Sequence, residues 1–249
     1  MAPLVQSLSQ LAVASLALIT TAQASPASIP ERDSKVPLRI MPLGASITYG
    51  EQSSTGNGYR NDLHNLLTDS GYTVNMVGSR KHGSMKDNDV EGWPGFRIKQ
   101  VQSKAQASVP SRLPNVFTVN AGTNDCAQNK QEGAGQRTDD LLEYLWKASP
   151  DSTIILSTLL INLNSTIEAR VEKVNNQIRE VAKQKASQKK RIVLVDMHAD
   201  DGPQKGDMAP DGTHPRDAGY NKMAKIWFRG IQEAASKGFL KKPKPLPGN

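Results

Sequence analysis

The fold of this chain is decided by the stretch LRIMPLGASI at residues 38–47, where an apolar run ends in small residues and a serine. Such a run has the length and composition of a buried strand. Gly44, Ala45 and Ser46 then predict a tight turn that leads from this strand into a helix. Four more apolar runs of strand length follow along the chain, at residues 74–77, 116–119, 153–157 and 192–195.

Segments with helical periodicity separate these runs. We expect helices at residues 58–70, near 98–107, near 141–145, from 165 to about 181 and from 215 to about 237. Ser165 and Glu168 have the spacing of a capping box at the start of the fourth helix. Continuous apolar strands that alternate with helices are typical of a parallel sheet covered on both faces. The sequence therefore predicts one three-layer α/β/α domain over residues 37–240, with a five-stranded, mostly parallel sheet.

The two ends of the chain differ in composition from this domain. Residues 1–24 carry no charged side chain, contain an apolar run at 11–19 and end in the small-x-small pattern Ala22-Gln23-Ala24. This pattern predicts a secretory signal peptide and an extracellular protein. The apolar run is too short to span a bilayer comfortably, so we expect no membrane partner. Residues 25–36 form a polar lead, and residues 241–249 form a basic, proline-rich tail.

Charge and cysteine content bear on two further classes of protein. A net charge of +7 is compatible with nucleic-acid binding, but the basic clusters at 189–191 and 241–244 lack interleaved aromatic residues. We therefore expect a solvated basic surface and no nucleic-acid partner. Cys126 is the single cysteine, which excludes an internal disulfide and indicates a buried structural thiol. The sequon that begins at Asn164 predicts glycosylation of that residue.

Three predicted strand ends carry polar residues suited to ester cleavage. Ser46 follows the first strand, Asn124 follows the third, and Asp211 and His214 lie in the loop after the fifth. Parallel sheets place reactive groups on loops at the carboxyl ends of their strands. Ester hydrolysis needs a nucleophile, a base, a group that orients the base and donors for the oxyanion, and these residues can supply such a set.

These segments resemble the SGNH (GDSL-type) hydrolases. GASI at 44–47, GTND at 122–125 and DGTH at 211–214 are similar to the first, third and last blocks of that family, and EGWPGFR at 91–97 is similar to the second. The family usually has Asp where this chain has Ala45. The resemblance implies a flavodoxin-like fold.

The resemblance also implies roles for individual residues. Ser46 would be the nucleophile, His214 the general base, and Asp211 the residue that orients the base. The oxyanion would be bound by the N–H of Ser46, the N–H of Gly95 and the side-chain amide of Asn124. Gly92 is the alternative to Gly95 as the functional glycine.

A finer resemblance concerns the substrate. MPLG at 41–44, STGNGYR at 54–60 and NDVEG at 88–92 are similar to secreted fungal members near carbohydrate esterase family 3. This similarity implies an esterase that removes acetyl groups from xylan or a related acetylated polysaccharide or oligosaccharide. We also expect a monomer, although the sequence has no feature that determines the oligomeric state. We expect no cofactor and no metal, because the aspartates at 200–207 do not form a dense calcium loop.

Several alternatives stay open at this level. His198 with Asp196 also follows the fifth strand and competes with the pair in the last block. Trp93 and Phe96 flank Gly95, where they would either bind a sugar or pack the loop. A short-chain lipase or lysophospholipase would use the same chemistry, although the sequence contains no long amphipathic lid. A catalytically silent carbohydrate-binding protein is a third possibility, against which the intact set of reactive residues argues.

Overall fold

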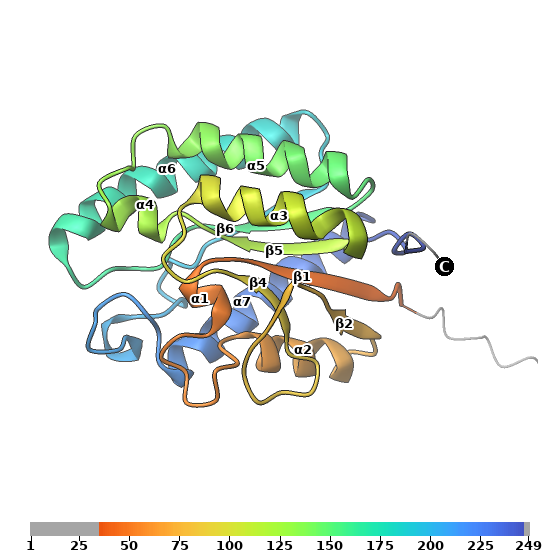
Figure 1. Cartoon of the computed structure of the whole chain (residues 1–249), viewed down its shortest axis with the longest axis horizontal. Coiled ribbons are helices and arrows are strands. Elements are labelled where there is room, and N and C mark those ends of the chain that lie inside the picture. The colour runs from red at the N-terminus through yellow and green to blue at the C-terminus, as the bar shows by residue number, and fades with distance from the viewer. Residues whose placement is uncertain (1–34, 247–249) are drawn as a thin grey trace, which may run out of the picture. The chain divides into compact units, whose positions relative to one another are not determined.

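A computed structural model describes residues 35–246 of the chain. The predicted signal peptide, nearly all of the polar lead and the last residues of the tail lie outside this range. Its first element is β1 (Leu38–Gly44) and its last is α7 (Asp217–Ser236). Strands and helices between them form one α/β arrangement (Figure 1). No helix in this part of the chain has both the length and the apolar character needed to cross a membrane.

The centre of the fold is a mostly parallel sheet. β1 pairs in parallel with β2 (Val74–Met76) and, further along the same strand, with β4 (Asp89–Gly92). On its other edge it pairs in parallel with β5 (Val116–Asn120), which is followed by β6 (Thr153–Ser157) and β7 (Ile192–Val195). The α/β prediction with a parallel sheet is therefore confirmed.

The predicted number of strands was too low. The described sheet has seven strands rather than five, because β4 joins β1 and the two-residue β3 (Arg80–Lys81) pairs antiparallel with β4. These two strands are short and largely polar, at the edge of the sheet. They therefore lack the continuous apolar run by which a buried strand can be recognised.

Helices cover both faces of the sheet (Figure 1). One face packs against α3 (Ile98–Arg112), α5 (Ala134–Ala148) and α6 (Ser165–Ser187), and the other against α2 (Arg60–Asp69) and α7. On β1, Met41 and Leu43 belong to the first core, whereas Leu38 and Ile40 belong to the second. Two short helices, α1 (Ser46–Tyr49) and α4 (Thr123–Ala127), follow the ends of β1 and β5, and a 3-10 turn, η1 (Lys205–Asp207), precedes α7.

Two predicted helix starts differ in detail. The N-cap of α6 is Asn164, whose side chain accepts hydrogen bonds from the backbone N–H groups of Thr166 and Ile167. The predicted capping box of Ser165 and Glu168 is thus wrong, since Asn is at least as good a cap as Ser and comes one residue earlier. The last helix begins at Asp217, two residues after Pro215.

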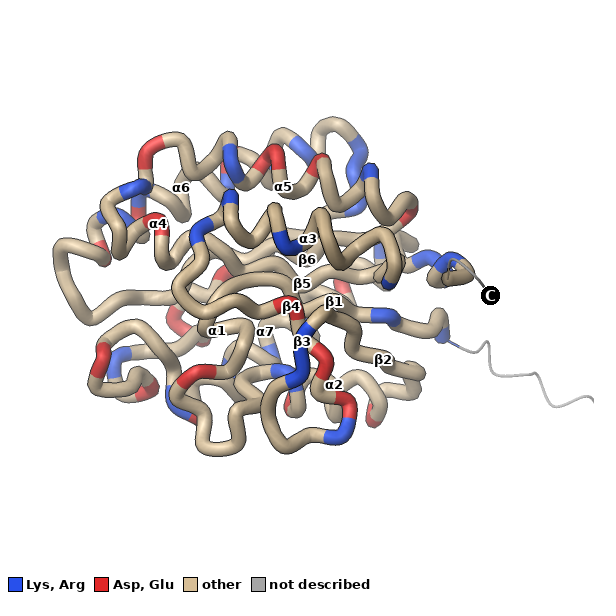
Figure 2. The backbone as a smooth tube through the Cα atoms, viewed as in Figure 1, with Lys and Arg blue, Asp and Glu red and all other residues tan. Residues whose placement is uncertain are grey.

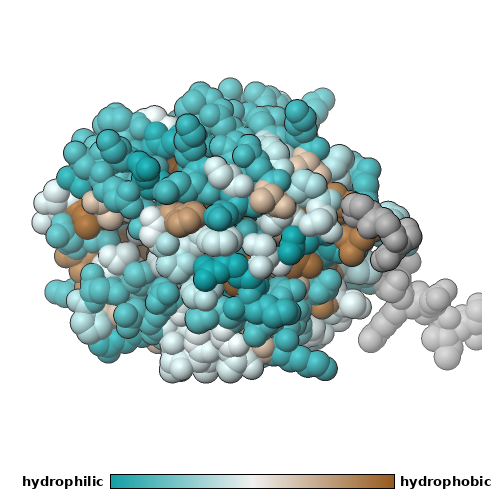
Figure 3. All heavy atoms as spheres, viewed as in Figure 1, coloured by the Kyte–Doolittle hydropathy of each residue, from teal (hydrophilic) through white to brown (hydrophobic). Residues whose placement is uncertain are grey.

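The surface shown in Figure 3 is mostly hydrophilic, with scattered apolar residues. Among the described residues, one large hydrophobic side chain is exposed, that of Leu163, with 43% of its surface accessible. A single residue of this kind does not form an extended apolar patch.

Candidate active site

The candidate nucleophile lies at the end of the central strand. Ser46 is the first residue of α1, directly beyond β1, and is nearly buried. The turn before it leaves no room for a side chain at Gly44, where a Cβ would lie 2.2 Å from the carbonyl oxygen of Asn120 and 2.3 Å from Oγ1 of Thr48. Glycine at this position therefore lets α1 fold back close to the end of β5.

The structure brings together three of the predicted site residues. The Oγ atom of Ser46 lies 2.7 Å from Nε2 of His214, and Nδ1 of His214 lies 2.8 Å from Oδ2 of Asp211. Serine and aspartate thus contact opposite sides of one imidazole ring. This is the geometry in which a histidine can accept the serine proton while the carboxylate fixes its orientation.

The carboxylate of Asp211 is held by its own loop. Its Oδ1 accepts hydrogen bonds from the backbone N–H groups of Thr213 at 2.9 Å and His214 at 3.0 Å. Partial burial raises the pKa of Asp211, but these two bonds and the contact with the His214 ring outweigh it and hold the pKa below its usual value. Asp211 therefore remains ionised beside the imidazole.

The predicted functional glycine occupies a tight turn. The N–H of Phe96 donates to the carbonyl of Trp93 at 3.1 Å, and Gly95 between them has a φ of +80°. Proline at position 94 followed by glycine with positive φ is the pattern of a type II turn. The turn's own hydrogen bond does not use the N–H of Gly95. Gly92, the alternative, instead ends β4, where a Cβ would lie 2.7 Å from the backbone nitrogen of Tyr49.

Asn124 connects the end of β5 to this turn. Its Nδ2 atom donates to the carbonyl of Phe96 at 3.0 Å, and Gln128 donates to the carbonyl of Gly95 at 3.3 Å. A side-chain amide has two N–H donors. The bond to Phe96 accounts for one of those of Asn124, which leaves the other available to a ligand.

Asp125 is a residue that the motif analysis did not assign. It is fully buried, and its carboxylate accepts hydrogen bonds from the N–H of Ile98 at 2.9 Å and from Nε of Arg137 at 3.1 Å. It therefore ties the start of α3, just after the turn with Gly95, to α4. The sequence feature that could have pointed to Asp125 is its position directly after Asn124 in the third block.

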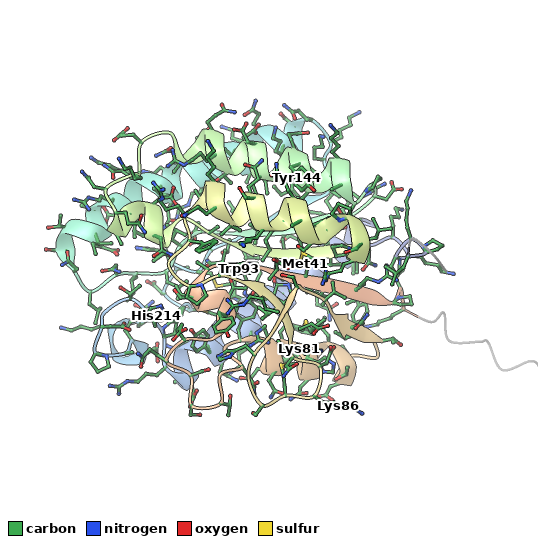
Figure 4. The ribbon with its side chains drawn as sticks, viewed as in Figure 1. Met41, Lys81, Lys86, Trp93, Tyr144 and His214 are labelled. Carbon is green, nitrogen blue, oxygen red and sulfur yellow. The ribbon has the colours of Figure 1, made fainter. Side chains whose placement is uncertain are left out.

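Trp93 and Phe96 are packed against each other and against neighbouring side chains. Their ring centroids are 5.6 Å apart, and Nε1 of Trp93 donates to Glu91 at 2.8 Å. The ammonium group of Lys104 lies 4.1 Å from the centre of the Trp93 ring. In Figure 4, Trp93 and His214 lie toward the same end of the molecule. These contacts account for both aromatic residues as loop packing, and substrate binding by either one stays a prediction.

The competing histidine has other partners. Nε2 of His198 lies 2.6 Å from Oε1 of Glu168, and Asp196 accepts hydrogen bonds from Thr158 and Arg179. The structure therefore does not bring this pair to Ser46. Within residues 35–246, no group of three or more His, Cys, Asp or Glu side chains is arranged to hold a metal ion.

Comparisons with known proteins agree with this geometry. Residues 40–227 match the GDSL-like lipase/acylhydrolase family. The chain therefore belongs to this family, and its fold is that of the SGNH hydrolases.

Individual relatives include carbohydrate esterases. The family 3 carbohydrate esterase of Clostridium thermocellum has a similar structure, with a TM-score of 0.72 and 26% identity over 81% of this chain and 98% of that one. A family 3 carbohydrate esterase from Talaromyces cellulolyticus shares the fold, with a TM-score of 0.69 and 21% identity over 80% of this chain and 99% of that one. A multidomain esterase of Ruminococcus flavefaciens is 28% identical over 82% of this chain, which spans only 29% of that relative.

The thiol of Cys126 is predicted to be unreactive in the folded protein. The residue is fully buried, and burial together with the nearby Asp125 carboxylate raises its pKa to about 12. Because the thiolate is the reactive form, a disulfide reagent at pH 8 should label the native protein very slowly and the urea-unfolded protein at once. Rapid labelling of the native protein, accompanied by loss of esterase activity, would show that Cys126 is not an inert, buried thiol.

Replacement of Asn124 by alanine should lower kcat by roughly 10²–10³-fold with little change in KM, as expected for a donor used mainly in the transition state. Gln128→Ala is the matched control, since it removes the hydrogen bond to Gly95 without removing a predicted oxyanion donor, and it should stay within a few fold of wild type. Steady-state kinetics on 4-nitrophenyl acetate provide the measurement. A raised KM with normal kcat in Asn124→Ala would instead make Asn124 a substrate-binding residue.

Proposed function

We propose that this protein is a serine esterase that hydrolyses small acyl esters through an acyl-enzyme. The observation that carries the proposal is the continuous contact from Asp211 through His214 to Oγ of Ser46, with 2.8 Å and 2.7 Å between successive atoms. Membership of the acylhydrolase family supports the same chemistry.

In this mechanism Oγ of Ser46 attacks the ester carbonyl while Nε2 of His214 accepts its proton. The oxyanion that forms is stabilised by the N–H groups of Ser46 and Gly95 and by the free N–H of Asn124. His214 then gives the proton to the departing alcohol, and an acyl group remains on Ser46. A water molecule, deprotonated by the same histidine, attacks the acyl carbon. The bond to Oγ then breaks, His214 returns the proton to Ser46, and the carboxylic acid leaves. Asp211 stabilises the imidazolium during both steps.

We further propose that the acyl group is acetyl and that the alcohol is a carbohydrate, such as a xylose unit of xylan. The similarity to a family 3 carbohydrate esterase supports the carbohydrate part of this proposal. The site is also shallow, since 20% of the side-chain surface of His214 and 38% of that of Asp211 are accessible to solvent. A shallow site suits a polymer that lies across the surface.

The other candidate functions have less support. A lipase or lysophospholipase needs an apolar surface for its acyl chain, and Leu163 alone, 43% exposed, does not provide one. A silent binding protein would have no need of the aligned contacts among Ser46, His214 and Asp211. Secretion, a monomeric state and glycosylation of Asn164 remain predictions from the sequence.

A comparison of substrates tests the proposed function. Wild-type protein should release acetate from acetylated xylan, and among 4-nitrophenyl esters its kcat/KM should fall as the acyl chain lengthens beyond acetyl. Ser46→Ala is the control, because it keeps the fold and removes the nucleophile, so it should abolish both activities. Faster turnover of long acyl chains with no acetate release from xylan would favour the lipase alternative, and inactivity on every ester would contradict the esterase proposal.

The identity of the base gives a separate prediction. His214→Ala should lose nearly all activity, because no other described histidine contacts Ser46. His198→Ala should stay within a few fold of wild type, since it removes a contact with Glu168 only. Measured kcat/KM values on 4-nitrophenyl acetate decide between them, and an active His214→Ala beside an inactive His198→Ala would show that the base has been misassigned.

A further inference from the structure

Arg80, on β3, makes an unusual set of contacts close to the candidate site. Its Nη1 atom donates to the carbonyl of Gly92 at 2.8 Å, and its Nη2 atom donates to the hydroxyl of Tyr49 at 3.2 Å. The centre of its guanidinium group lies 4.2 Å from the centroid of the Tyr49 ring and 4.7 Å from that of Trp93. Arg80 thus donates hydrogen bonds to Tyr49 and Gly92, and its planar cation also stacks on the rings of Tyr49 and Trp93.

These two segments carry two of the predicted oxyanion donors. Tyr49 is the last residue of α1, the helix that begins at Ser46. Gly92 and Trp93 lead into the turn that contains Gly95. The backbone N–H groups of Ser46 and Gly95 therefore belong to the two segments that Arg80 links.

The nucleophile helix has few means of its own to stay in place. It contains only four residues, and its N-cap, Ala45, makes no side-chain hydrogen bond. Isolated helices of this length are unstable, so the position of α1 depends on tertiary contacts. Tyr49 supplies several of these, because its ring also stacks on His82, with 3.7 Å between the ring centroids.

An ion pair does not explain the presence of Arg80. No carboxylate of residues 35–246 lies within 4.0 Å of its guanidinium group, whereas the adjacent Lys81 contacts Asp89 at 2.6 Å. The buried carboxylate of Glu91 has other partners, since it accepts hydrogen bonds from the backbone and hydroxyl of Ser79 and from Trp93. Figure 2 shows the two basic residues of β3 as a blue segment beside β4.

The geometry points to Arg80 as a positioning residue that holds α1 and the Gly95 turn at a fixed separation. This inference rests on the proposed function, because the two segments matter to activity only if they carry the oxyanion donors. Transition-state stabilisation depends on donors fixed to within a fraction of an ångström. Lysine cannot replace arginine here, because an ammonium group lacks the planar fork that donates in two directions while stacking on rings.

The test is kinetic, on 4-nitrophenyl acetate, a substrate too small to reach far from Ser46. Arg80→Gln should lower kcat by roughly 10- to 100-fold while KM changes less than about twofold. Arg80→Lys should fail to restore the activity, although it keeps the charge. The matched control is Lys81→Gln, which removes a charge from the same strand and should leave kcat unchanged.

A second variant covers the case in which Arg80→Gln does not fold. Tyr49→Leu removes the ring and hydroxyl on the other side of the link, so it should lower kcat in the same way. If both variants fold, the double variant should lose less than the product of the two single effects, because both break one link.

The outcomes separate this inference from the proposed function. Normal kcat in Arg80→Gln, a higher KM with normal kcat, or full rescue by Arg80→Lys would overturn the positioning role while wild type stayed active and Ser46→Ala inactive. If Arg80→Gln fails to fold, normal kcat in Tyr49→Leu would overturn it. A wild-type protein with no activity on any ester would instead remove the proposed function on which the inference rests.

Discussion

The contact between Oγ of Ser46 and Nε2 of His214 joins two residues 168 positions apart in the chain. It can form only if the end of the first strand and the last loop before α7 reach the same edge of the sheet. The parallel register of β1, β5, β6 and β7 meets this condition, because it brings their carboxyl ends to one side. Helices on both faces bury the sheet and keep that edge in place, so the position of the site is a consequence of the fold.

Close packing at this edge leaves little freedom for the nucleophile. Gly44 has no space for a Cβ, and the neighbouring loops are tied both by the pairing of β4 with the end of β1 and by side-chain hydrogen bonds. Asn124 and Gln128 bind the turn of Gly95 from α4, Asp125 binds the start of α3, and Arg80 binds the turn and α1 from β3. Asp125 and Arg80, which lie outside the catalytic set, thus link the segments that carry the predicted oxyanion donors. The side chains of His214 and Asp211 are partly exposed, so the site is open to solvent at this edge.

The sequence predicted well those features that depend on short-range pattern. The apolar runs that became β1, β5, β6 and β7 are recognisable because parallel strands buried on both faces must be apolar throughout. The spacing of Asp211 and His214 predicted a pair that meets within one loop, and the two side chains do meet. The short strands β3 and β4 could not be predicted, because they lack an apolar run and depend on pairing, β4 with the end of β1 and β3 with β4. The role inferred for Arg80 also has no motif, since it arises only when Tyr49 and Gly92 come together in the fold.

Stoichiometric labelling with a serine-directed phosphonate tests whether Ser46 is the nucleophile of this esterase. The labelled protein is digested and its peptides are identified by mass spectrometry while residual activity is followed. We expect one adduct per chain, on Ser46, with activity lost in proportion to its occupancy. Full occupancy of Ser46 with activity retained, or complete inactivation with the adduct on another residue, would contradict it.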